Sequence, residues 1–312
     1  MDFQCEICHN TEKNIPYTGR EMMFCTKEEF LYFKCPVCGC LQIAEIPASL
    51  EKYYPDNYYS YKQKETSPVE IYTNSLIRNS IRFKLDSILP VYYLSSKYKK
   101  YHRYRKLWLS HIHENSSVLD IGCGKGSLLK ELHIFGFKNL TGIDPYINED
   151  TIIDGSIRIL KREVYDLNEK FDFVMLHHAF EHMPNPHDVF NQLNKIVADN
   201  GRILIRIPLT DGFAWRKYEM NWFQVDAPRH LFLHTVKSIK VLSEEHGLEI
   251  ESIKYDSTYH QFSNSEKIAA KILNSETIKP SLAKRLIWKF KTKRLNSAKD
   301  GDQACFILKK KL

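Results

Sequence analysis

Short apolar runs alternate with amphipathic segments from about residue 117 onward. The runs SVLDI, NLTGI, FDFVMLH and RILIRI are apolar at most positions, a pattern typical of strands buried on both faces. Between them, residues 126–135 and 186–198 have helical spacing. This alternation predicts a parallel sheet with helices on both faces.

The C-terminal third predicts one more helix, over residues 236–246, which ends at Gly247. Two closing strands follow, LEIESIKYD and QACFILKK, with a basic interruption at 256–300 that is expected to be a helical insertion. A composition shift after the tyrosine-rich stretch YYPDNYYSY places a domain boundary near residue 62. The sequence therefore predicts an N-terminal domain over 1–62 and a second domain over 63–312, whose residues 63–113 form a helical lid divided at Pro90.

Composition indicates an ordinary globular protein, with 43% hydrophobic and 27% charged residues. A net charge of +7 permits an anionic partner without requiring one. The first residues, MDFQCEICHN, lack the pattern of a secretion signal. No apolar run approaches the roughly 20 residues that span a bilayer. A cytoplasmic location is expected, where thiols stay reduced.

Six of the eight cysteines lie within the first 40 residues. Two C-x2-C pairs, Cys5 with Cys8 and Cys35 with Cys38, have the spacing of a zinc ribbon. Four thiolates would form a closed, tetrahedral and structural zinc site. Cys25 and Cys40 remain, either as small buried residues or, for Cys25, in exchange with one of the four ligands.

The stretch VLDIGCGKGSLL, at 118–129, contains a glycine-rich turn directly behind an apolar run. The spacing fits neither the phosphate-binding P-loop nor the dinucleotide motif G-x-G-x-x-G. It resembles the first motif of class I S-adenosylmethionine-dependent methyltransferases, with Asp120, Gly122, Gly124 and Gly126 in place. Glycines at such a turn adopt positive φ and let the backbone approach the cofactor.

The resemblance implies S-adenosylmethionine as cofactor, with the Asp120 carboxylate facing its ammonium group. Asp144, which lies 22 residues after Gly122, is expected to accept hydrogen bonds from the ribose hydroxyls. Asp166 is expected at the adenine amino group, with Val164 or Tyr165 against the ring, although a surface loop remains the alternative. FDFVMLHHAFEHMPNP is similar to the fourth motif of the superfamily, in a branch that ends in EH, and places His178 near the cofactor.

This likeness covers residues 117–255 and 303–309. It implies a Rossmann-like α/β fold with a seven-stranded mixed sheet whose last strand is antiparallel. The stretch PLTDGFAWRKYEMNWFQVDAPRHLFLHT is similar to a segment of bacterial methyltransferases of surface-polysaccharide pathways. The expected acceptor is therefore a hydroxyl of a sugar or polysaccharide precursor, free or lipid-linked.

Acceptor-side residues are expected to include Trp215 and Trp222 as flat faces for sugar rings, and Arg229 as the holder of an anionic group. His230 is the preferred general base and His178 the second choice, since a neutral imidazole accepts a hydroxyl proton near pH 7. A purely structural hydrogen bond remains the alternative for both histidines. Glu181 and His182 either brace the loop or take part in catalysis.

Two other functions remain open: methylation of ribosomal or other RNA, and a non-catalytic module that only binds the cofactor. Nucleic acid is the less favoured partner. Residues 282–295 combine apolar residues at helical spacing with Lys and Arg. Such a helix either contacts an anionic membrane face peripherally or packs by its apolar stripe with the charges in solvent.

Overall fold

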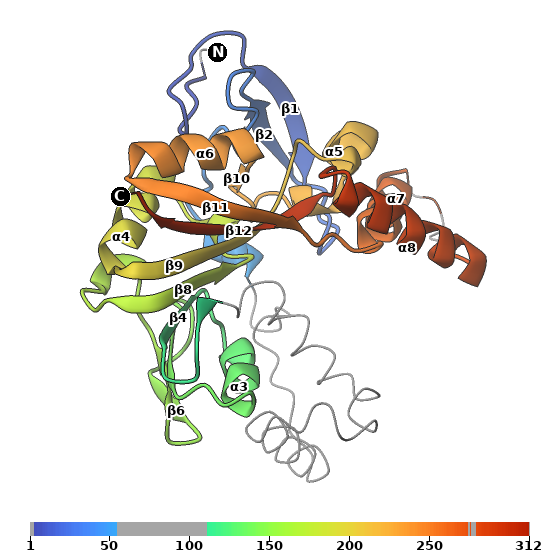
Figure 1. Ribbon diagram of the computed structural model, residues 1–312. Helices are drawn as coiled ribbons and strands as arrows, with labels where there is room; N and C mark the ends of the chain where they lie inside the picture. The colour runs from blue at the N-terminus through green and yellow to red at the C-terminus, as the bar shows by residue number, and fades with distance from the viewer. Residues whose placement is uncertain (1–2, 55–110, 274, 276–278, 312) are drawn as a thin grey trace. The chain divides into compact units, whose positions relative to one another are not determined.

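The computed structural model describes residues 3–54, 111–273, 275 and 279–311 (Figure 1). The chain forms two compact units. Unit 1 comprises Met1–Pro55, His178–Asn191 and Ile205–Leu312, and unit 2 comprises Asp56–His177 and Gln192–Leu204. The predicted boundary near residue 62, and all but the last three residues of the predicted lid at 63–113, lie outside the described residues and stay predictions.

Unit 2 is built on parallel strands. Strand β4 (Ser117–Ile121) pairs in parallel with β5 (Asn139–Ile143) and with β8 (Phe171–His177), and β5 pairs in parallel with β7 (Ile157–Leu160). The last four residues of β4 are all buried. Continuous burial explains why these strands appear in the sequence as unbroken apolar runs.

The large sheet has the strand order β11-β12-β9-β8-β4-β5-β7-β6. Its remaining members are β6 (Thr151–Ile153), β9 (Val197–Pro208), β11 (Leu248–Tyr255) and β12 (Gln303–Lys310), and β12 is antiparallel to β11. The predicted Rossmann-like mixed α/β fold is confirmed. The sheet has eight strands instead of seven, because the short β6 pairs antiparallel with β7 at the edge. Two of its three residues are exposed, so no apolar run marks it.

Three helices form where the sequence predicts them: α3 (Ser127–Ile134), α4 (Pro186–Ile196) and α6 (Val236–Glu245). Helix α6 begins with a capping box, in which the Thr235 hydroxyl accepts a hydrogen bond from the backbone N–H of Ser238. Figure 1 shows α6 lying along β11 of the same unit. The shorter elements are α5 (Phe213–Tyr218) and the 3-10 turns η1 (Leu50–Tyr53), η6 (Val164–Asp166), η7 (Phe180–His182), η8 (Glu219–Asn221) and η9 (Phe223–Val225).

Unit 1 contains a second, four-stranded sheet. Its order is β1-β2-β3-β10, from β1 (Ile15–Arg20), β2 (Glu29–Lys34), β3 (Leu41–Ile43) and β10 (Phe232–Leu233). The first three strands come from the cysteine-rich N-terminal region, whereas β10 follows the DAPRH sequence almost 200 residues later. The N-terminal region therefore shares one hydrogen-bonded sheet with the segment expected to bind the acceptor.

The predicted basic insertion at 256–300 forms two helices, α7 (His260–Ile272) and α8 (Leu282–Ser297), which lie side by side in Figure 1. Trp288 of α8 stacks on Phe262 of α7 with ring centroids 6.0 Å apart. The opposite face of α8 leaves Leu286, Ile287 and Phe290 more than half exposed. Within the described residues, no helix combines the length and apolarity needed to cross a bilayer.

Candidate functional site

The glycine loop of unit 2 joins β4 to α3 through three left-handed residues. Gly122, Gly124 and Gly126 have φ values of +72°, +52° and +72°. The positive φ of Gly126 favours glycine, and a Cβ atom there would also lie 2.7 Å from Cδ1 of Ile159, which would have to shift. The N–H of Gly122 donates to the carbonyl of Ile143 at 2.9 Å, which fastens the loop to the end of β5.

Two aspartates lie at the loop. Asp120 is buried in β4, and Asp144 follows β5. The Asp144 carboxylate accepts hydrogen bonds of 2.9 Å from the N–H groups of Gly124 and Tyr146. Burial, and then the charge of Asp144, raise the pKa of Asp120 to about 8. Burial also raises the pKa of Asp144, against the lowering effect of its two hydrogen bonds. The pair is thus suited to a ligand that brings positive charge.

Cys123, inside the loop, has a packing role. Its Sγ lies where a Cβ atom at Gly142 would be only 2.6 Å away. The small side chain of Cys123 therefore fills the space that glycine leaves on β5.

Asp166, the expected adenine contact, ends the short turn η6. One of its carboxylate oxygens accepts a hydrogen bond from the N–H of Glu163 at 3.0 Å and so closes its own turn. Val164 is buried and Tyr165 is 42% exposed. An ionised carboxylate has further lone pairs for a second donor, so the adenine contact of Asp166 stays a prediction.

His178 in unit 1 has both ring nitrogens engaged. Its Nε2 lies 2.7 Å from Nη1 of Arg206, and its Nδ1 lies 3.1 Å from Oε1 of Glu181. Because arginine only donates, Nε2 accepts and the proton sits on Nδ1, which donates to Glu181. With its lone pair occupied by Arg206, His178 is poorly placed to take a proton from a substrate. Its predicted contact with the cofactor stays a prediction.

His230, the other expected base, is almost fully buried. Its Nδ1 lies 2.7 Å from the carbonyl oxygen of Gln224 and must donate to it, so the lone pair is on Nε2. Burial and then the charge of His182 lower the pKa of His230 to about 4, against the raising effects of Asp226 and Glu181. The imidazole is therefore neutral near pH 7 and has a lone pair for a proton.

Arg229 does not hold an acceptor group, contrary to the expectation from the sequence. The side chain is fully buried, and its guanidinium donates to both carboxylate oxygens of Asp226 at 2.6 and 3.0 Å. It also donates to Glu21 at 3.0 Å and to the carbonyl of Tyr53 at 3.4 Å. Two carboxylates already neutralise its charge and the side chain is fully buried, so it is not accessible to an external anion.

The two tryptophans expected to face sugar rings are also core residues. Trp222 is fully buried, and its indole N–H donates to Asp302 at 3.1 Å. Trp215 is 4% exposed and packs edge-on against Tyr17 and Trp222. Their faces are covered by protein, so the expectation that they form flat faces for sugar rings was wrong.

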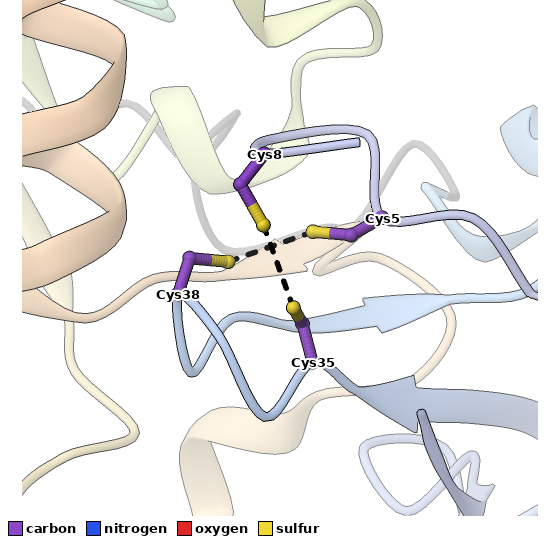
Figure 2. Close-up of side chains that lie close together, drawn as sticks. All are labelled: Cys5, Cys8, Cys35 and Cys38. Carbon is purple, nitrogen blue, oxygen red and sulfur yellow. Dashed lines mark hydrogen bonds between the residues drawn. The ribbon is translucent and has the colours of Figure 1, made fainter. Parts of the chain in front are cut away.

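The four cysteines of the predicted ribbon converge in unit 1, and Figure 2 shows their side chains pointing at one another. Sγ of Cys5 lies 3.5 Å from that of Cys38, and Sγ of Cys8 lies 3.5 Å from that of Cys35. All four sulfur atoms lie within 4.8 Å of one another. Tetrahedral zinc at about 2.3 Å from each sulfur places sulfurs about 3.7 Å apart, so the arrangement fits zinc. Cys25 and Cys40 lie outside this group.

Comparison with known proteins identifies the family. A family model described as a methyltransferase domain matches residues 93–253, just over half of the chain. The chain belongs to the methyltransferase-domain family. This match contains the glycine loop, both aspartates and the EH and PRH sequences. It does not extend to the cysteine cluster, whose assignment as a zinc ribbon stays a prediction.

The curated relatives of this chain share little sequence identity with it. The ubiquinone biosynthesis O-methyltransferases of Photobacterium profundum and Glaesserella parasuis serovar 5 are 26% identical over 127 residues and 28% identical over 129 residues. Each alignment covers 35% of this chain and 54% of the relative, so the chain spans about half the length of the curated relatives it matches.

Among solved structures, a SAM-dependent methyltransferase from Archaeoglobus fulgidus is 21% identical, with a TM-score of 0.44 and coverage of 70% of this chain and 95% of that one. A putative sarcosine dimethylglycine methyltransferase from Galdieria sulphuraria is 14% identical, with a TM-score of 0.44 and coverage of 75% of this chain and 98% of that one.

The buried carboxyl of Asp120 gives a pH-dependent prediction. Its folded-state pKa of about 8 is above the ordinary 3.8, so between these values the folded state binds more protons than the unfolded state. The contribution of the Asp120 carboxyl to the free energy of unfolding is therefore present at low pH and is lost as pH rises toward 8. Asp120→Asn removes the ionisation, so the mutant should gain stability over wild type by on the order of 2 kcal/mol between about pH 6 and about pH 9.

Urea unfolding of the cofactor-free protein at the two pH values measures this gain. Asp154→Asn, at an exposed turn of unit 2, is the matched control and should show no pH-dependent difference from wild type. A constant difference between Asp120→Asn and wild type at both pH values would contradict the raised pKa.

Proposed function

We propose that this protein is an S-adenosylmethionine-dependent methyltransferase. The observation that carries the proposal is the pairing of Asp120 and Asp144 at a loop of three left-handed glycines. A buried carboxyl with a pKa of about 8 gains from a cationic ligand, because the positive charge stabilises its ionised form. A dinucleotide has no such ammonium group, so these residues favour the sulfonium cofactor.

Each residue has a defined part in binding. Asp120 pairs with the ammonium group of the cofactor, Asp144 accepts hydrogen bonds from the ribose hydroxyls, and Asp166 accepts one from the adenine amino group. The bound cofactor supplies an electrophilic methyl group on sulfur. The protein has to place the acceptor in line with that methyl group, exclude water and remove the acceptor proton.

The proposed acceptor is a hydroxyl of a sugar or polysaccharide precursor. Two observations favour oxygen: the curated relatives are named as O-methyltransferases, and His230 is a neutral, buried imidazole with its lone pair on Nε2. Of the two predicted bases, His230 is therefore the better proton acceptor. The saccharide itself rests on the likeness of the PRH-containing stretch to enzymes of surface-polysaccharide pathways.

We also propose that Cys5, Cys8, Cys35 and Cys38 hold a structural zinc ion. All four ligands come from protein, so the site is closed and has no position for a substrate. Metal binding would supply folding energy to the small four-stranded sheet, whose core is limited.

The assignment of Asp144 predicts a loss of cofactor affinity in Asp144→Asn. The substitution keeps the shape of the side chain but removes its charge, so hydrogen bonds from the ribose hydroxyls weaken and the dissociation constant for S-adenosylmethionine rises roughly 10- to 100-fold. Calorimetric titration of wild type, Asp144→Asn and the control Asp154→Asn measures the effect. Unchanged affinity in Asp144→Asn would refute the assignment.

The acceptor class is tested by transfer of a labelled methyl group. Wild type is expected to label nucleotide-linked or lipid-linked sugars, and His230→Gln to lose most of that activity while its affinity for the cofactor stays intact. Transfer only to RNA, together with RNA affinity that falls steeply with salt, would establish the nucleic-acid alternative. Cofactor binding with no transfer to any acceptor would indicate a non-catalytic module.

A lipid-linked acceptor would suit the exposed face of α8. Ile287 and Phe290 are 65% and 67% exposed on a helix rich in Lys and Arg, the composition of a helix that binds anionic membrane surfaces. We expect the protein to sediment with phosphatidylglycerol vesicles, and Phe290→Ser to weaken partitioning roughly tenfold through lost apolar burial. Ile152→Ser, at a position 70% exposed in unit 2, is the control and should partition as wild type does.

A further inference from the structure

Three side chains of unit 1 lie close together, and the proposed function assigns a role to only one of them, His230. One ligand atom from each of Glu181, His182 and His230 lies within 4.8 Å of the others. Glu181 and His182 belong to η7, and His230 is the last residue of the DAPRH sequence. The rings of the two histidines contact each other edge-on, with centroids 4.6 Å apart.

Glu181 is a fully buried carboxylate with one unused oxygen. Its Oε1 accepts the hydrogen bond from Nδ1 of His178, whereas no described residue offers a hydrogen bond to its Oε2. A buried, charged acceptor without a hydrogen-bond partner destabilises the folded state. Such a site needs a further ligand for Oε2.

The two histidines are oriented as metal-binding histidines usually are. Nδ1 of His182 lies 2.9 Å from the carbonyl oxygen of Arg229, and Nδ1 of His230 lies 2.7 Å from that of Gln224. Both Nδ1 atoms must therefore carry the proton, which leaves the lone pair of each ring on Nε2. A backbone carbonyl that holds the non-ligating N–H is the common support of a metal-bound imidazole.

The surrounding charges also favour a cation. Arg229 is the only guanidinium paired with this turn among the described residues, and it is neutralised by Asp226 and Glu21. Glu181 adds a third carboxylate, so the buried charge around the histidines is negative. Oδ2 of Asp226 also lies 3.9 Å from Nε2 of His230.

We propose that Glu181, His182 and His230 bind one divalent transition-metal ion, with zinc as the best match. Two imidazoles and one carboxylate form a common set of protein ligands for catalytic zinc and leave a fourth position open. This set is chemically distinct from the four-cysteine cluster, which is closed. Binding at this site does not depend on the proposed methyl transfer.

Occupancy changes the part played by His230. Coordination uses the lone pair on Nε2, so a metal-bound His230 accepts no proton. A hydroxyl at the open position would instead have its pKa lowered by the metal and would lose its proton to solvent without a protein base. This consequence, unlike the site itself, rests on the proposed function.

The test is metal stoichiometry of the full-length protein, without S-adenosylmethionine. After loading with zinc and removal of the excess, we expect two zinc ions per chain, one at the cysteines and one at this site. His182→Ala and Glu181→Gln should each retain one. His246→Ala, which disrupts a more exposed group of His187, Glu245 and His246, is the control and should retain two.

Cobalt separates the two sites spectroscopically, even if a variant is partly destabilised. Cobalt-loaded wild type should show thiolate-to-cobalt charge-transfer bands together with weaker bands of a nitrogen and oxygen site. His182→Ala should lose only the weaker set, and Cys35→Ser mainly the thiolate bands. One metal ion per chain in wild type, or a second ion that persists in both His182→Ala and Glu181→Gln, would overturn the proposal. Because cofactor affinity is measured separately, a failure to bind S-adenosylmethionine would leave this result unaffected.

Discussion

The buried guanidinium of Arg229 is the interaction on which the arrangement of the DAPRH turn in unit 1 depends. A charge with no exposure to water must be paired on several sides, and here its partners come from three separate segments: Asp226 in its own turn, Glu21 between β1 and β2, and the carbonyl of Tyr53. The backbone carbonyl of Arg229 then accepts the hydrogen bond from His182. One buried cation thus fixes where the two neighbouring histidines lie.

The cysteine-rich region reinforces the same turn from its other side. The hydroxyl of Tyr32, on β2, donates to the backbone carbonyl of His230 at 2.9 Å, and Leu231 donates to the carbonyl of Glu181 at 2.8 Å. The groups of unit 1 that could bind a ligand are therefore held both by backbone hydrogen bonds and by one atom of each side chain. Such support leaves Nε2 of His230 and Oε2 of Glu181 uncommitted, which is what a ligand site requires.

Much of unit 2 could be predicted from sequence, because its determinants are local. Asp120 and the glycines lie within seven residues, and left-handed backbone at a strand-to-helix turn selects glycine wherever the turn occurs. Asp144 is found from the family resemblance together with its spacing of 22 residues after Gly122, since adjacent parallel strands end at the same edge of a sheet. The strand β6 was missed because a short, mostly exposed edge strand has no apolar pattern.

The roles of the residues in the PRH-containing stretch could not be assigned from sequence, because they depend on distant partners. Arg229 meets Glu21, 208 positions away, and Trp222 meets Asp302, 80 positions away. The polar and aromatic residues of the PRH-containing stretch suggested a binding surface. In the structure, Arg229, Trp215 and Trp222 are buried in the core. The tautomer of His178 likewise follows from Arg206, which no local pattern connects to it.

The pairing of β3 with β10 makes the N-terminal region inseparable from the rest of unit 1. Phe232 and Leu233 are buried and pair with Gln42 and Leu41. If the proposed zinc ion is bound, oxidants or chelators that strip it from the cysteine thiolates would loosen the turn that carries His230. The proposed methyl transfer would then depend on the thiol redox state and zinc supply of the cell.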